Sequence, residues 1–401
     1  MQDVVIAGYL RTAQSRSRPN DPGRDWFHSL RADELLAQVL PELIRRTGLA
    51  PEEIDDFVVG SATGVGEQWT FGGRSPLWLA KLPETISSKF VDQQCGSSLA
   101  ALQLGFMEVA MGFADVVMIG GMEHMTRLPM GGITNERGLV ALSQSLFFDP
   151  EYNHLDMNAI MNMGLNAERL SALSGITRRE MEEWAVRSHQ RAGQAFDDGF
   201  FADEILPIDA VQADGSVMTV QRDQAVRGET TLEDLARLKA PFKKDGVITA
   251  GVSSPLNAAA TGMILMSKAK AKALGIKPLA TLRSIGFAGL DPTIMGHGPV
   301  PASLKALDKL GLKPADIDFW EINEAFAIVA LNCIKELGLN PDAVNVMGGG
   351  LAIGHPLGAT GNRLVGTLAR ILAAKGGRWG CANACVGGGQ GVATIIERED
   401  Y

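Results

Sequence analysis

The sequence predicts a soluble α/β protein made of two similar halves, and three observations predict it. Of 401 residues, 46% are apolar, 21% are charged and 46 are glycine, a composition typical of globular α/β proteins. Residues 48–62 ("GLAPEEIDDFVVGSA") and 311–325 ("GLKPADIDFWEINEA") are identical at six of fifteen positions without gaps. Their offset of 263 moves Cys95 onto Gly358, and each of these residues lies in a glycine-containing turn before a helix-like stretch.

Both related segments predict the same local structure, a helix ending at Gly, a turn begun by Pro and then a strand. Chance similarity is the alternative, because this turn pattern is common. A duplicated protein is the simplest interpretation, with an N-terminal half at 1–124 plus 251–275 and a C-terminal half at 276–401. Residues 125–250 are rich in Met and in charge and have no counterpart, so we expect an inserted loop or cap subdomain there.

The net charge and the cysteine content indicate which partners this protein could bind and in which cellular compartment it is expected. The net charge of −9 disfavours nucleic acid, because phosphate binding needs a basic surface. The N-terminal "MQDVVIAGYLRT" lacks the pattern of a secretion signal, and no apolar run is long enough to span a membrane. Four cysteines in a chain of this length do not suggest a disulfide framework, which favours the cytoplasm. Cys381 and Cys385 have no second Cys/His pair at ligand spacing, so we expect no metal site.

Three polar residues in glycine-rich surroundings are candidates for chemistry. Cys95 lies in "VDQQCGSSLAALQLGF" (91–106), where a strand passes into a helix. A buried core cysteine is the alternative, but a helix N-terminus also favours a reactive thiol. His355 lies in "GGGLAIGHPLGATG", in the half-repeat that pseudosymmetry brings near Cys95, and a base beside a thiol makes an activated nucleophile. Cys385 in "ACVGGGQG" adds a second thiol with backbone N–H groups that suit an oxyanion.

Motifs along nearly the whole chain resemble the thiolase family. They are "CGSS" at 95–98, "GGMEHM" at 120–125, "SHQRAGQAF" at 188–196, "FADEILPI" at 201–208, "TAGVSS" at 249–254, "GHGPVPA" at 296–302, "EINEAFA" at 321–327, "GGGLAIGHPLGATG" at 348–361 and "CVGGGQG" at 385–391. Each motif alone is weak, but their order and spacing are specific. The resemblance implies two βαβαβαββ halves in a five-layered αβαβα packing, with two central helices buried between the sheets.

The resemblance also implies a set of catalytic roles. Cys95 matches the nucleophile that takes the acyl group from a 3-oxoacyl-CoA, and His355 matches the base that activates it. Cys385 matches the thiol that protonates the departing acetyl-CoA enolate, or abstracts the α-proton in the reverse Claisen condensation. Asn323 would orient a water that joins His355 in one oxyanion hole, and the N–H groups of Cys95 and Gly387 would form another.

The implied binding residues are less sharply defined. Ser254 matches a serine that touches the pantetheine arm, and Met163 matches a methionine of the acyl pocket, with a core or loop role as the alternative for each. Ala325 and Phe326 belong to the matched "NEAF" segment, and His297 either faces the substrate or is a solvated loop histidine. The family further implies coenzyme A as a substrate with no bound cofactor, fatty acid β-oxidation, and a homodimer or homotetramer.

A few positions depart from the family pattern. Asp92 and Ser98 stand where Asn and Gly are usual, Asn162 where short-chain biosynthetic members tend to have His, and Ala258 where an acidic residue is common. A carboxylate close to a thiol raises the pKa of that thiol, so we expect Asp92 to serve a structural hydrogen-bond network. The departures favour a degradative enzyme for a longer or unusual 3-oxoacyl-CoA.

Other functions stay open on the sequence. One is a short-chain acetoacetyl-CoA thiolase, and another is a non-catalytic thiolase-like subunit that binds CoA or lipid and needs a partner chain. The second would be expected to lose a catalytic residue, and this chain keeps Cys95, Asn323, His355 and Cys385. A 3-oxoacyl synthase of the same fold is disfavoured, because those enzymes lack a cysteine in a "CVGGG" setting.

Overall fold

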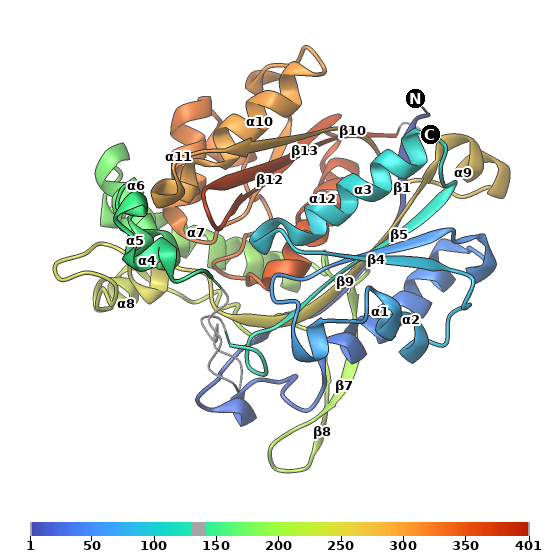
Figure 1. The fold of residues 1–401 in the computed structure, drawn as a ribbon, viewed down its shortest axis with the longest axis horizontal. Helices are drawn as coiled ribbons and strands as arrows, with labels where there is room; N and C mark the ends of the chain where they lie inside the picture. Colours follow the sequence, from blue (N-terminus) through green and yellow to red (C-terminus); the bar gives the residue numbers. More distant parts are fainter. Residues whose placement is uncertain (1, 130–141, 400–401) are drawn as a thin grey trace.

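The strands of the two halves lie side by side in one mixed sheet (Figure 1). The computed structural model describes residues 2–129 and 142–399. Part of the predicted insertion (130–141) and the extreme ends of the predicted halves (1 and 400–401) therefore lie outside the described residues. The N-terminal strands follow the order β1 (Val4–Thr12), β9 (Asn257–Ser267), β5 (Val116–His124), β3 (Asp56–Gly60) and β4 (Ser87–Val91). The C-terminal order is β10 (Ala280–Gly289), β13 (Gln390–Arg398), β12 (Trp379–Val386) and β11 (Phe319–Ile322).

The same strand order occurs twice. In each half the first strand is followed by the fifth, the fourth, the second and the third, except that an isolated bridge from Trp320 to Val344 stands for the third strand of the C-terminal half. A short antiparallel pairing of β1 with β10 joins the halves. The two segments whose sequences are related also match in structure, since Pro51–Glu53 and Pro314–Asp316 are 3-10 turns that lead into β3 and β11.

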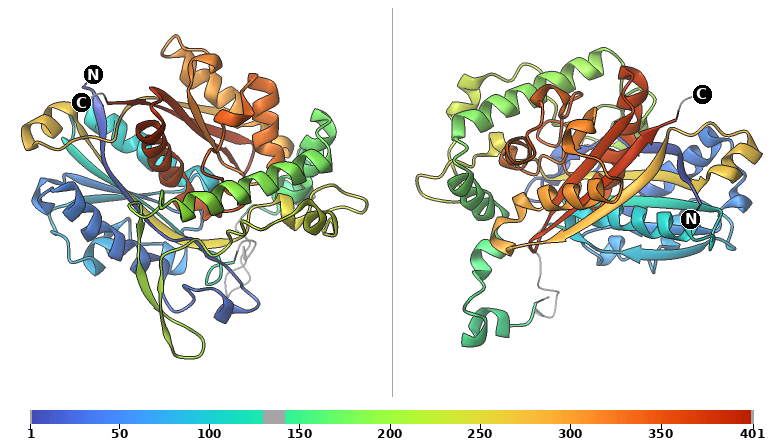
Figure 2. Two further views of the ribbon diagram at one scale, coloured as in Figure 1. Left: turned by 180° about the vertical axis from the view of Figure 1, so that it is seen from behind. Right: turned by 90° about the horizontal axis from the view of Figure 1, so that it is seen from above.

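Three helix layers alternate with these strands, which confirms the predicted five-layered fold. Helices α3 (Ser97–Ala110) and α12 (Leu357–Lys375) contact one another between the two halves of the sheet (Figures 1 and 2). Helix α1 (Ala32–Thr47) covers the outer face of the N-terminal strands, and α10 (Pro299–Asp308) with α11 (Ala327–Leu337) covers that of the C-terminal strands.

Alternation along β12 shows how the sequence produces these layers. Cys381 and Cys385 belong to the apolar cluster that contains α10 and α11, whereas Ala382 and Ala384 belong to the cluster that contains α3 and α12. Successive side chains of a strand point to opposite faces, and both faces are covered, so the strand is apolar throughout. Small residues on the inner face let the central helices approach closely.

The inserted segment leaves the sheet after β5 and returns at β9. Its helices are α4 (Ser145–Phe148), α5 (Met157–Met161), α6 (Met163–Ser174), α7 (Arg178–Asp197) and α8 (Leu232–Ala236). Strand β6 (Ile205–Leu206) pairs in parallel with β1, and the hairpin of β7 (Ile208–Val211) and β8 (Val217–Val220) projects from the molecule (Figure 1). The predicted domain boundaries remain a prediction. Among the described residues, no helix is both long and apolar enough to cross a membrane.

Candidate active site

Cys95 lies at the junction of β4 and the central helix α3. A 3-10 turn over Gln94–Gly96 directly precedes α3, and Gln94 has a left-handed backbone with φ 48°. The Asp92 Oδ1 atom accepts the Gln94 N–H at 2.8 Å, so Asp92 takes part in the structural network that the sequence predicts. The thiol is therefore held at the start of a buried helix by a tight turn.

The thiol of Cys95 is almost fully buried in a small apolar cluster with Ala62, Met125 and Leu357. Burial raises its pKa to about 12, and the nearby Glu123 and Asp92 carboxylates act in the same direction, whereas hydrogen bonds from the N–H groups of Gly387 and of Cys95 itself lower the pKa. Without substrate, Cys95 is consequently a neutral thiol at neutral pH. The two N–H groups named for an oxyanion hole do converge on its sulfur.

His355 sits at the end of the glycine loop, two residues before the Leu357 that touches Cys95. Gly354 has φ 126°, and the His355 N–H donates to Asn257 Oδ1 at 2.8 Å. The Nδ1 atom of His355 lies 2.7 Å from the Thr360 hydroxyl, which itself donates to the Pro356 carbonyl. A hydroxyl has one proton, so Nδ1 carries the ring proton and Nε2 keeps its lone pair.

The environment of His355 keeps the ring neutral. Burial lowers its pKa to about 3, and the positive charge of Arg363 adds to the effect. The Nδ2 atom of Asn323, at the end of β11, lies 3.2 Å from His355 Nε2. The structure thus brings Asn323 and His355 together as predicted, and the Asn323 amide donates to the lone pair on His355 Nε2.

Cys385 completes the group at the end of β12. Its thiol is fully buried, and burial raises its pKa well above the usual value, with further contributions from the neighbouring Cys95 and Cys333 sulfurs. The turn that follows begins with Gly387, whose backbone approaches the side chain of Gln94. Segments distant in sequence therefore bring the Cys385 and Cys95 thiols near one another, while His355, which pairs with Asn323, lies two residues before the Leu357 that clusters with Cys95.

Most of the predicted binding residues lie beside one another. The Ser254 N–H donates to the Ala325 carbonyl at 3.0 Å, and Ser253 forms a β-bridge with Phe326. The Phe326 ring packs edge-on against Phe242, with ring centroids 6.4 Å apart. The Phe242 ring also lies against the first turn of α6, which begins at Met163.

His297 is half-buried and contacts α11, where its Nδ1 atom lies 3.2 Å from Nδ2 of Asn332. It therefore has a protein partner rather than being freely solvated. That it faces the substrate stays a prediction.

Three departures from the family pattern have structural explanations. Asn162 caps α6 by accepting the Gly164 and Leu165 N–H groups, so its side chain is used by the helix. The Ser98 hydroxyl accepts the Asn362 N–H at 3.1 Å and so links the two central helices. Ala258 is fully buried in β9, where an acidic side chain would lose its hydration.

The sequence prediction missed three buried residues that shape the site. Glu324 accepts hydrogen bonds from Trp184 and Ser188 of α7 and from the Leu351 N–H of the glycine loop. Glu123 accepts the N–H groups of Ala62 and Gly358, and Thr360 holds the His355 ring. Each of the three lies inside one of the motifs that resemble the family, and this position is the only indication of its role that the sequence offers.

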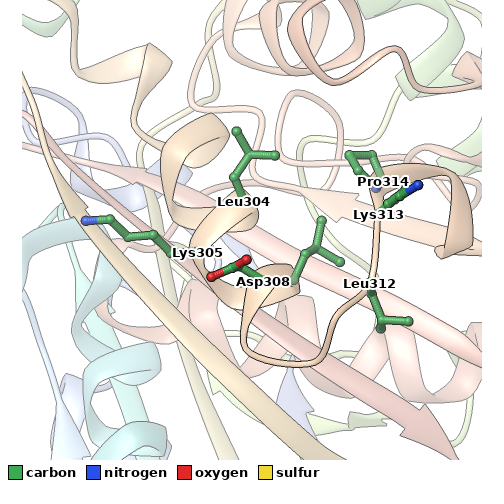
Figure 3. A pocket seen from close by; sticks show the side chains of 7 residues that line it. Leu304, Lys305, Asp308, Leu312, Lys313 and Pro314 are labelled. Atoms are coloured by element: carbon green, nitrogen blue, oxygen red, sulfur yellow. The ribbon is translucent and has the colours of Figure 1, made fainter.

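A separate shallow depression at the C-terminal end of α10 offers no comparable chemistry (Figure 3). Its volume is about 440 Å³, and its lining consists of Leu304, Lys305, Leu307, Asp308, Leu312, Lys313 and Pro314. It lies beside the outer helix layer and contains no thiol or imidazole, so the buried group around Cys95 is the candidate active site.

Comparison with known proteins agrees with this geometry. The model of the thiolase N-terminal domain matches residues 4–269, and that of the thiolase C-terminal domain matches residues 276–398. The chain belongs to the thiolase family. Family membership confirms the resemblance inferred from the motifs and the fold that it implies.

Individual relatives cover the chain from end to end. A 3-ketoacyl-CoA thiolase of Saccharophagus degradans is 40% identical over 402 residues, which is 99% of this chain and 98% of that protein. A 3-ketoacyl-CoA thiolase of Vibrio cholerae is 40% identical over 99% of this chain and all of its own length. Human mitochondrial 3-ketoacyl-CoA thiolase superposes with a TM-score of 0.87 at 32% identity over 99% of both chains. An acetyl-CoA acetyltransferase of Bacillus anthracis gives 0.86 at 34% identity over 100% of this chain and 99% of its own.

Proposed function

We propose that this thiolase-family chain cleaves a 3-oxoacyl-CoA with coenzyme A to give acetyl-CoA and a shortened acyl-CoA, through an acyl group on Cys95. The observation that carries the proposal is that Cys95, Cys385, His355 and Asn323 are all buried, with the two thiols near one another and the imidazole paired with the amide. Relatives about 40% identical over the full chain are named 3-ketoacyl-CoA thiolase, which supports this substrate class.

The first half-reaction forms the acyl-enzyme. His355 Nε2 takes the Cys95 proton, and the sulfur attacks the 3-oxo carbon, whose oxygen gains charge beside the Cys95 and Gly387 N–H groups. The bond between carbons 2 and 3 then breaks, and its electrons pass to the acetyl-CoA enolate. Cys385 donates its proton to that enolate, while His355 and a water on Asn323 stabilise the enolate oxygen.

The second half-reaction releases the product. Coenzyme A enters as a thiol, loses its proton to a base of the site and attacks the carbonyl carbon of the acyl group on Cys95. The Cys95 sulfur leaves and recovers a proton, which restores the resting enzyme. Sulfur suits both steps, because it is nucleophilic and is also a good leaving group. Neither half-reaction calls for a bound cofactor or metal, and coenzyme A serves as substrate.

Trapping of the acyl group tests this proposal. A 3-oxoacyl-CoA supplied without coenzyme A should add an acyl mass to the peptide that contains Cys95, and Cys95→Ala should abolish both this adduct and thiolysis. Iodoacetamide should modify Cys95 preferentially. Thiolysis that survives Cys95→Ala, or a Cys95 that stays unmodified, would favour the non-catalytic CoA-binding alternative.

We also propose a preference for substrates longer than acetoacetyl-CoA. The support is that Asn162 serves as the cap of α6 and that Phe242 packs against both Phe326 and the first turn of α6, which begins at Met163. Thiolysis rates measured across a series of 3-oxoacyl-CoA chain lengths should therefore rise beyond the four-carbon acetoacetyl substrate. A clear preference for acetoacetyl-CoA would instead assign the short-chain function.

We infer further that the protein forms a homodimer or a tetramer of dimers. Strand β4 is the edge strand of the N-terminal half, with an outer edge that no described strand of this chain pairs. Near it, Trp69, Phe71 and Trp78 form an exposed aromatic cluster in which ring centroids are 5.4 and 6.1 Å apart. Analytical ultracentrifugation should give a multiple of the 42.7 kDa chain, and Trp78→Glu should weaken that assembly.

A cytoplasmic location and a role in fatty acid β-oxidation complete the proposal. All four cysteines are free thiols, which suits a reducing compartment. Cleavage to acetyl-CoA is the degradative direction that this pathway uses. Cell fractionation, together with growth of a deletion strain on fatty acids as the carbon source, tests both.

A further inference from the structure

The turn in front of Cys95 holds an unfavourable backbone conformation. Gln94 has φ 48°, in the left-handed region that residues with a side chain seldom adopt. Cys95 follows immediately, so the direction of its thiol depends on this peptide unit. Such a backbone conformation persists only where contacts with neighbouring residues stabilise it.

Asp92 supplies two hydrogen bonds to that residue. Its Oδ1 atom accepts the Gln94 backbone N–H at 2.8 Å and the Gln94 side-chain amide at 3.4 Å. A second clamp comes from Ser97, whose hydroxyl accepts the Gln93 N–H at 3.0 Å and donates to the Gln94 carbonyl at 2.6 Å. Asp92 thus fixes the amide side of Gln94, and Ser97 fixes its carbonyl side.

The conformation of this turn also reaches the hydrogen-bond donor of the thiol. The Gln94 side chain packs beside Gly387, where a Cβ atom would lie 3.7 Å from Gln94 Cγ. The Gly387 N–H in turn hydrogen-bonds to the Cys95 sulfur. A change in the Gln94 conformation would therefore displace both the sulfur and the peptide that donates to it.

We propose that Asp92 is a positioning residue, whose carboxylate holds Gln94 in the left-handed turn that aims the Cys95 thiol at the Gly387 N–H. This inference rests on the proposed role of Cys95 as nucleophile. It assigns a use to a carboxylate that stands where the family pattern has Asn.

Besides the hydrogen bonds that Asp92 accepts, its negative charge raises the pKa of the Cys95 thiol. The titratable groups that act on Cys95 are Glu123 from β5, Asp92 from the turn and Cys385 from β12. Two of them are carboxylates, and both raise the pKa of the thiol. Asn at position 92 would keep the acceptor oxygen and remove one of these charges.

Four variants test the proposal: Asp92→Asn, Asp92→Ala, Gln94→Gly and the double variant Asp92→Ala/Gln94→Gly. Asp92→Asn should keep kcat close to that of the parent, while its Cys95 is alkylated by iodoacetamide at lower pH. Asp92→Ala should lower kcat by about tenfold, the rate equivalent of one lost hydrogen bond to a charged acceptor. Glycine adopts positive φ without strain, so the double variant should recover the kcat of Gln94→Gly.

Peptide mass spectrometry of alkylated Cys95 and circular dichroism show that each variant keeps its thiol and its fold. The proposal fails if Asp92→Ala has the parent kcat, if Asp92→Asn is as slow as Asp92→Ala, or if the double variant is no faster than Asp92→Ala while Gln94→Gly is active. Where Gln94→Gly is itself inactive, the difference between the Asn and Ala variants decides. Failure of the proposed function would appear separately, as thiolysis by Cys95→Ala.

Discussion

Thr360 lies between the ring of His355 and the backbone of α12. Its hydroxyl donates to the Pro356 carbonyl and accepts from His355 Nδ1, which keeps the lone pair on Nε2, the atom of the proposed base. We expect Thr360→Val to lower kcat by about tenfold, because the ring loses the acceptor that sets its tautomer. Thr360→Ser keeps the hydroxyl and should retain activity. Steady-state kinetics of the two variants check this, and equal kcat values would show that the hydroxyl does not orient the ring.

Glu123 is a buried carboxyl whose protonation affects stability. Burial raises its pKa from 4.5 to about 7, against hydrogen bonds from the Ala62 and Gly358 N–H groups that lower it. Between these two pH values the folded state holds a proton that the unfolded state has released, so stability falls as pH rises through this window and is flat above it. The full difference is about 3 kcal/mol.

Glu123→Gln has no such proton to lose. We therefore expect the unfolding free energy of the parent, relative to that of Glu123→Gln, to fall by a few kcal/mol from pH 4.5 to pH 7.5. Urea unfolding at several pH values measures this. A difference that stays constant, or that grows with pH, would show that Glu123 is ionised throughout.

At the scale of single residues, the sequence predicted the central residues of the candidate site and missed most of the residues that hold them in place. Cys95, His355 and Cys385 stand in short motifs with unusual glycine content, so their positions were visible. Glu123 is held instead by the N–H of Gly358, which is 235 residues away, and no local pattern shows such a pairing. The role of Thr360 became visible only from the first turn of α12, which places its hydroxyl beside the His355 ring.

Helix α7 of the inserted segment packs directly on the glycine loop that carries His355. A Cβ atom at Gly348, where φ is 80°, would lie 2.6 Å from both the Ala192 Cβ and the Ser188 carbonyl. Gly348→Ala should therefore push α7 away, at a cost of about 1–3 kcal/mol from overpacking in addition to backbone strain. Hydrogen exchange along α7 should accelerate, and kcat should fall because the loop shifts.

Gly338→Ala is the matched control for this change. Gly338 has φ 65° at the end of α11, and a Cβ atom there meets no atom within 4 Å. It should show the backbone strain alone, with unchanged exchange in α7 and unchanged kcat. If the two alanine variants behave alike, the close approach of α7 does not govern the loop.

The related segments show which elements were predictable from sequence and which were not. Each segment contains a turn that begins with Pro, followed by a strand. The sequence predicted these turns and strands because Pro and Gly restrict the backbone locally to such turns. The third strand of the C-terminal half is reduced to a bridge at Val344. Strand β6, only two residues long, pairs with β1 through contacts that no periodic pattern shows.

At the scale of the whole molecule, the duplication predicted two similar halves and the resemblance to the thiolase family predicted the layered core. Nothing in the sequence predicted how the insertion packs on that core. The packing of the insertion on the core depends on Arg11 of β1, which is fully buried. A hydrophobic pattern does not predict a buried arginine. The Arg11 guanidinium donates to Glu204 at 2.7 Å and to both Asp223 oxygens at 2.8 and 3.0 Å. Both partners belong to the insertion, so the cap is tied to the first strand of the core.

This buried ion-pair group predicts that insertion and core unfold together. Asp223→Asn leaves Glu204 as the carboxylate that still pairs with Arg11 and weakens the acceptor of the Gln14 N–H, so we expect about 1.5–3 kcal/mol of destabilisation. Glu183→Gln, which removes the exposed Arg179–Glu183 pair of α7, should cost less than about 0.5 kcal/mol. Thermal unfolding followed by circular dichroism and by tryptophan fluorescence should give one coincident transition in the parent, at a lower temperature in Asp223→Asn. Two separate transitions in the circular dichroism of the parent would mean that the insertion melts on its own and that Arg11 does not couple it to the sheet.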